Sequence, residues 1–224
     1  MSVARLAPAT RGAALVVLVT LAAGGCTTSD PDPKTSLSVK PPEVDPTQAC
    51  PGLITDAAGK ALTKVLQSAH LVNDDAQTIG AATMGKSLED FYRAGPKTGE
   101  FAGPACTVTG IVGSGKRVGE IRLAAKGGNA DAAGTDQTGV RVTRAERERG
   151  VSFDCVSNRV GSTRGVPLRI TTSYVDRYSS SGGDALLGES YLVVAHSAAV
   201  AMAEELGCEN NGGLPEGSSS LPKP

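Results

Sequence analysis

Residues 106–124, CTVTGIVGSGKRVGEIRLA, decide the fold of this chain. Glu120 and Arg122 alternate with apolar neighbours, which indicates a β-strand with one face in solvent. We expect strands at 106–112 and 118–124 and a turn at 113–115. The turn reads Gly-Ser-Gly, and glycines are what a tight hairpin turn requires. The stretch therefore predicts an antiparallel hairpin.

The same stretch also matches the spacing of a phosphate-binding loop. Residues 110–116 fit the pattern G-x-x-x-x-G-K after a strand. Arg117 stands where such a loop needs Ser or Thr to hold magnesium, and the residues after it alternate as a strand instead of opening a helix. The hairpin is therefore the preferred interpretation, and no cofactor is predicted.

Strands and helices continue on both sides of the hairpin. Further strands are expected at 140–143, 151–156 and 168–175. A helix over 55–69, with Thr55 as its N-cap, and a short helix over 87–93, with Ser87 as its cap, are expected before the hairpin. After the strands we expect a short strand at 191–195 that runs into a helix ending at Leu206, with one helix over 185–206 as the alternative.

These elements predict an α+β fold. It consists of an antiparallel sheet of about five or six strands packed with an N-terminal and a C-terminal helix. Residues 50–208 are expected to form this single domain. The glycine-rich segment 124–139 is expected to be a mobile loop, and 209–224 a disordered tail.

The chain begins with a basic, then apolar, then small-residue order that is typical of a secretory signal. Its apolar part, residues 13–23, is too short for a membrane span, which takes about 20 residues. The run LAAGGC, residues 21–26, resembles a bacterial lipoprotein signal. The resemblance implies a signal peptide over 1–25 and a lipid, such as palmitate, attached at Cys26, which would hold the protein on the extracytoplasmic face of the cell membrane. Ordinary cleavage near 22–24 is the alternative.

Residues 26–49 are rich in Pro, Ser and Thr and contain little that could be buried. Such a segment is predicted to be an extended tether. At roughly 3 Å per residue, it could hold the domain up to about 70 Å from the bilayer.

Four cysteines lie in the predicted domain, at positions 50, 106, 155 and 208. An even number in an exported protein indicates disulfides, and three pairings are possible. We favour Cys50 with Cys106 and Cys155 with Cys208, because each pair would join the end of a predicted helix to a predicted strand. A zinc site is disfavoured because no two cysteines have the close spacing that zinc sites use.

Charge is unevenly distributed along the chain. The formal net charge of −1 argues against general nucleic-acid binding, and the absence of Trp leaves few surfaces on which sugars or bases could stack. Residues 141–177 hold 8 arginines and 4 acids, a balance of +4, whereas residues 178–224 hold 6 acids and one lysine, a balance of −5. The candidate ligand face comprises Arg141, Arg144, Arg159 and Arg169. The alternative is two solvated faces of opposite sign.

No catalytic residue and no metal site is predicted. Only two histidines, His70 and His196, could serve as a base, and each lies at the end of an apolar run. His196 is next to Ser197, but neighbours in sequence point in different directions. A hydrolase that uses His196 or His70 with a remote acid such as Asp154 or Asp176 is kept as an alternative.

The segments CPGLIT, residues 50–55, and ACTV, residues 105–108, resemble cysteine-containing segments of small surface lipoproteins of actinobacteria. The resemblance implies an antiparallel α+β fold, an envelope location and the first disulfide, and it transfers no catalytic residue. We therefore expect a non-enzymatic, lipid-anchored binding or interaction domain, with an envelope protein or a small ligand as partner. An accessory subunit that tethers an envelope complex is a further alternative.

Overall fold

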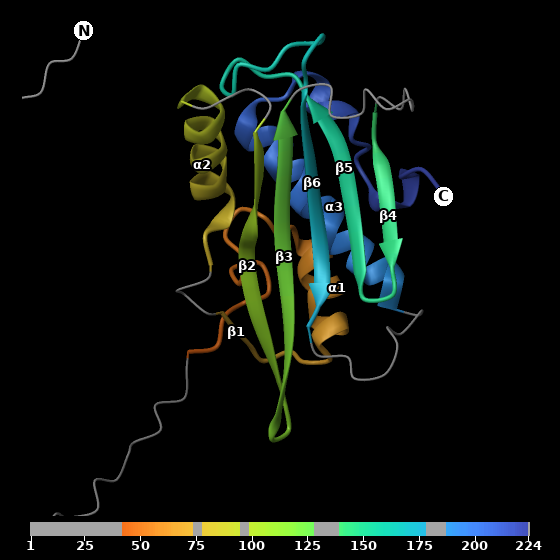
Figure 1. Ribbon diagram of the computed structural model, residues 1–224. Coiled ribbons are helices and arrows are strands. Elements are labelled where there is room, and N and C mark those ends of the chain that lie inside the picture. The colour runs from red at the N-terminus through yellow and green to blue at the C-terminus, as the bar shows by residue number, and fades with distance from the viewer. Residues whose placement is uncertain (1–41, 74–77, 95–98, 128–138, 178–186, 224) are drawn as a thin grey trace, which may run out of the picture. The chain divides into compact units, whose positions relative to one another are not determined.

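The predicted hairpin is present and is longer than expected. In the computed structural model, which describes residues 42–73, 78–94, 99–127, 139–177 and 187–223, it consists of β2 (Glu100–Val112) and β3 (Gly115–Gly127) (Figure 1). The turn places Gly113 at φ +57°, a conformation that favours glycine. Pro104 is accommodated because the β2–β3 register shifts between Pro104 and Cys106.

Six antiparallel strands form one sheet in the order β1-β2-β3-β6-β5-β4. The other four strands are β1 (Leu71–Asn73), β4 (Arg141–Ala145), β5 (Glu148–Cys155) and β6 (Leu168–Asp176). The predictions of β4, β5 and β6 are confirmed within a few residues at each end. β1 was not predicted, because three residues are too few to show a period.

Three helices cover one face of the sheet (Figure 1). They are α1 (Asp56–Leu66), α2 (Gly80–Ala94) and α3 (Gly188–Leu206). Buried residues such as Leu123, Phe153 and Ile170 alternate along their strands with more exposed ones, and α1 and α3 contact the sheet on this buried side. The predicted α+β fold is therefore confirmed.

The two N-terminal helices differ in how well they were predicted. Thr55 caps α1, since its hydroxyl accepts a hydrogen bond from the backbone N–H of Ala58. α2 is twice as long as expected, at 15 residues. Ser87 is not its cap but lies inside the helix, where its hydroxyl donates to the carbonyl of Thr83 at 2.9 Å.

The predicted strand at 191–195 is wrong, because α3 is one helix from Gly188 to Leu206. Of its 19 residues, 13 are buried, so that it has no continuous polar face. A helix buried on nearly all sides needs no apolar stripe, which removes the period by which helices are identified. Within the described part of the chain, no helix combines the length and the apolar character that a membrane span requires.

The folded region extends beyond both predicted boundaries. Residues 42–49, expected in the tether, pack on the domain: Ala49 is buried and the N–H of Val44 donates to the carbonyl of Leu71 at 2.8 Å. The predicted disordered tail is also folded up to residue 223, because Leu214 and Leu221 find apolar surface to bury against. Two isolated leucines among Gly, Ser and Pro form no apolar pattern in the sequence, which is why this segment was predicted to be disordered.

Several predictions lie outside the described residues. These include the signal peptide, the lipid attachment at Cys26 and the tether up to residue 41. Of the predicted loop 124–139, residues 128–138 are also outside, while 124–127 belong to β3.

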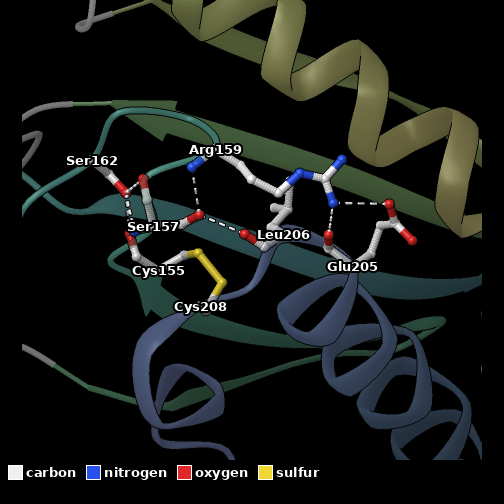
Figure 2. The surroundings of a disulfide bond; sticks show 7 residues. All are labelled: Cys155, Ser157, Arg159, Ser162, Glu205, Leu206 and Cys208. Carbon is white, nitrogen blue, oxygen red and sulfur yellow. Dashed lines mark hydrogen bonds and ion pairs between the residues drawn. A yellow bond between two sulfur atoms is a disulfide. The ribbon is translucent and has the colours of Figure 1, made fainter.

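Both predicted disulfides are present. Cys50 is bonded to Cys106, and Cys155 to Cys208. The second bond joins the end of β5 to the residue that follows the C-cap of α3 (Figure 2). Beside it, the Ser157 hydroxyl donates to the carbonyl of Leu206, so that the end of α3 is held by a covalent and a polar contact.

Candidate functional site

The face of the sheet opposite the helices is the candidate site, and we call it the open face. Its orientation follows from Thr172, whose hydroxyl donates to the carbonyl of Ala195 in α3 at 2.7 Å. Thr171 and Ser173 therefore point away from α3. The strand registers assign to the open face Glu120, Arg122, Ala124 and Lys126 of β3, Arg169, Thr171, Ser173 and Val175 of β6 with Arg177 directly after it, Glu148, Ser152 and Asp154 of β5, Arg141 of β4, and Glu100 of β2.

Arg169 and Asp154 form a bidentate ion pair across β6 and β5. The Nε and Nη2 atoms of Arg169 lie 2.7 and 2.8 Å from the two carboxylate oxygens of Asp154. The backbone N–H of Gly139 donates to the same carboxylate at 3.2 Å. The fork geometry fixes both side chains, with the guanidinium group aligned to the carboxylate plane.

Glu120 lies between two guanidinium groups. Its carboxylate accepts from Nε of Arg177 at 2.5 Å, and its second oxygen lies 3.5 Å from Nε of Arg122. The Glu120 side chain is 10% exposed, whereas those of Arg122 and Arg177 are 46% and 48% exposed. The Glu120 carboxylate is therefore covered by the two guanidinium groups, and it is these positively charged groups that contact solvent.

Short side chains lie between these charged groups. Three of them, Ala124, Thr171 and Ser152, lie side by side in the register of β3, β6 and β5, and Arg141 of β4 follows in the same row. The hydroxyl groups of Ser152 and Thr171 are 2.7 Å apart and hydrogen-bonded. Successive side chains on the same face of a strand lie about 7 Å apart. This row therefore lies between Lys126 and Arg169 on one side and Arg122 on the other.

The four predicted ligand-face arginines do not form one cluster. Arg141 and Arg169 lie on the open face, but Arg144 lies on the same side of β4 as the core-facing Val142. Arg159 lies at the end of α3, bonded to the carbonyl and carboxylate of Glu205 (Figure 2) and to Glu89 of α2 at 3.2 Å. The hydrogen bond that Arg159 donates to the Glu205 carboxylate raises the pKa of Arg159, in keeping with a structural cation.

Sequence reasoning missed Arg122, Lys126 and Arg177 as members of the open face. The signal was present, because residues an even number apart on a strand share a face. Arg122 and Lys126 share the parity of Glu120, and Arg177 shares that of Arg169. The missing information was which strands are neighbours: β3 pairs with β6 across a long sequence separation.

Neither His196 nor Ser197 is arranged for catalysis. His196 Nε2 donates to the carbonyl of Pro215 at 2.9 Å, and burial lowers the pKa of this imidazole. The Ser197 hydroxyl donates to the carbonyl of Leu53 at 2.9 Å and accepts from the N–H of Thr55 at 3.0 Å. Both side chains thus serve backbone groups of other segments.

The remaining candidates of the hydrolase alternative are also held in separate places. His70 Nδ1 lies 2.7 Å from the Glu43 carboxylate at the domain surface. Asp154 is bound by Arg169, and Asp176 accepts a hydrogen bond from the Tyr191 hydroxyl at 3.0 Å. The structure therefore brings none of the proposed histidine and acid pairs together by a hydrogen bond among the described residues.

The described residues contain no group of three His, Cys, Asp or Glu side chains suited to a metal ion. A shallow depression of about 490 Å³ between α2 and α3 is lined by Pro51, Gly52, Ala81, Ala82, Ala201, Glu204 and Glu205. Of its two acids, Glu205 is bonded to Arg159. No protein-family model, curated protein or solved structure matches the chain.

Proposed function

We propose that this protein is a non-enzymatic, lipid-anchored binding domain on the extracytoplasmic face of the cell membrane. The observation that carries the proposal is the open face, where polar and charged side chains of five adjacent strands are covered by no described helix. The groups that could do chemistry, His196, Ser197 and Asp176, are instead used in internal contacts.

The location is supported by the leader and by the disulfides. The order of basic, apolar and small residues before Cys26 is that of an exported lipoprotein. Two disulfides in one domain suit an oxidising compartment. Durable membrane attachment needs two or more acyl chains, which a modified cysteine with an acylated amine would supply.

The anchor is tested by metabolic labelling with radioactive palmitate, followed by membrane fractionation. We expect the wild-type chain to carry label and to sediment with membranes, and the Cys26→Ser chain to lose both. Unlabelled wild-type protein, or label retained by Cys26→Ser, would contradict the lipid anchor.

The binding role is tested by in-cell cross-linking of the anchored protein, followed by identification of what is recovered. We expect a stoichiometric envelope partner or ligand. Deleting residues 27–41 distinguishes bridging from free binding, since a spacer matters only to a bridge, and the deletion must stop at 41 because residues 42–49 are folded. Substrate turnover by the purified protein that His196→Ala abolishes would show an enzyme instead.

A further inference from the structure

We infer that the open face binds an acidic polypeptide segment, whose carboxylates contact the guanidinium groups over β3 and β6. The inference rests on the proposed binding function and names the class of partner. The charged groups of this face differ in how exposed they are to solvent. Glu120 lies deep, at 10% exposure, and the two arginines that cover it are nearly half exposed.

The two central strands carry a local excess of positive charge. On the open face these strands hold four cations, Arg122, Lys126, Arg169 and Arg177, and the acid Glu120, while Arg169 is paired with Asp154 of β5, which leaves a balance of +2. Glu120 is shared by two arginines and can neutralise only one of them. Each guanidinium group has five N–H donors, so that the pairs with Glu120 leave donors for a further acceptor.

Acids flank this basic centre. Glu100 on β2 lies opposite Lys126, and Glu148 on β5 lies opposite Val175. A uniformly charged polymer or an anionic bilayer would be repelled by these flanks, whereas a polypeptide can place separate carboxylates over the centre.

Other features of the face also favour a polypeptide over a bilayer. The exposed large apolar residues of the described chain, Ile79, Val112 and Val166, lie outside it, while membrane-surface binding depends on apolar insertion. Bidentate guanidinium–carboxylate geometry already occurs here between Arg169 and Asp154.

The test measures binding of labelled probes to the full chain carrying Cys26→Ser. The probes are a peptide of alternating Glu and Ser, its Lys counterpart, polyphosphate, and vesicles of phosphatidylcholine with phosphatidylglycerol. The variant Lys126→Glu with Arg122→Gln alters the open face. The control variant, Lys60→Glu with Arg164→Gln, changes the net charge by the same amount away from the open face. Lys60 lies on α1, and Arg164 pairs with Glu209.

We expect the acidic peptide to bind, the open-face variant to weaken it at least about tenfold, and the control to match wild type. Arg177→Lys keeps the charge but loses the fork, and we expect it to weaken binding as well. Thermal unfolding of each variant verifies the fold. If the double variant unfolds, Lys126→Glu is tested alone, because Lys126 is exposed.

The inference is overturned if the peptide does not bind, if the control weakens binding equally, or if only polyphosphate or vesicles depend on these residues. Its failure is distinguishable from that of the proposed function. If a partner is recovered in cells and its recovery is unaffected by the open-face variant, the binding function is supported but the open face is not the binding surface. Recovery of the chain alone, with no probe bound, contradicts both.

Discussion

The Tyr174 hydroxyl is buried and has no hydrogen-bond partner among the described residues. Burial raises the pKa of Tyr174 well above its usual value, so the phenol stays neutral. Its ring packs against Tyr191, with centroids 5.2 Å apart, and this contact does not need the hydroxyl.

We expect Tyr174→Phe to leave the free energy of unfolding unchanged or to raise it by up to about 1 kcal/mol, because it removes an unsatisfied buried donor. The matched control is Tyr191→Phe, whose hydroxyl donates to buried Asp176. That change should cost about 1–2 kcal/mol. Urea denaturation measures both, and a larger loss for Tyr174→Phe than for Tyr191→Phe would contradict the assignment.

His196 makes the stability of the fold depend on pH. Burial lowers the pKa of His196 in the folded state, so the unfolded chain binds its proton more readily. We therefore expect the free energy of unfolding to fall as pH drops below about 6.5, until the folded-state pKa is passed. Chemical denaturation over a pH series measures this.

His196→Gln should flatten that dependence, because Gln keeps a donor for the Pro215 carbonyl but does not titrate. His70→Gln is the control, since His70 lies at the surface, with its side chain 66% exposed. An unchanged pH profile in His196→Gln would refute this source of the dependence.

At the scale of elements, the second disulfide attaches α3 to the sheet. Cys155 and Cys208 are 53 residues apart, and closing a loop of that length stabilises by about 4 kcal/mol in the chain-entropy account. We expect Cys155→Ala with Cys208→Ala to lower the free energy of unfolding by about 3–4 kcal/mol. Denaturation with and without reductant checks it, and reductant should have a smaller effect on the variant than on wild type.

Prediction from sequence succeeded where an element has two unlike faces. Glu120 and Arg122 alternate with buried neighbours, and α1 has a polar side. It failed for α3, where the residues around Val194 are buried on nearly all sides and short apolar runs resemble strands.

The candidate site was predicted only in part for a different reason. Arg141 and Arg169 were identified by sequence proximity, and they do share a face. Arg122 joins them through β3–β6 pairing, which no local pattern specifies, and Arg159 leaves them because the chain after Cys155 turns toward the end of α3.

At the scale of the whole molecule, the C-terminal segment is part of the domain. Leu214 and Leu221 are buried, and the Pro215 carbonyl accepts from His196. We expect a chain ending at residue 208 to lose about 3 kcal/mol or more of unfolding free energy, since burying each leucine contributes roughly 1.5–3 kcal/mol. A chain ending at 221 is the control, because residues 222 and 223 are exposed. Equal thermal stability of the two truncations would contradict this.

The Cys50–Cys106 bond also decides how the domain bears mechanical load. Tension applied before residue 42 first meets the Glu43–His70 pair and the Val44–Leu71 bridge, which are weak. It then reaches Cys50 and passes through the sulfur atoms into β2. The intervening chain, with α1, β1 and α2, lies in a covalent loop that carries no force. When the protein is stretched, its short entry segment therefore detaches first, and the load then passes into β2, while α1 and α2 lie outside the covalent path of the force.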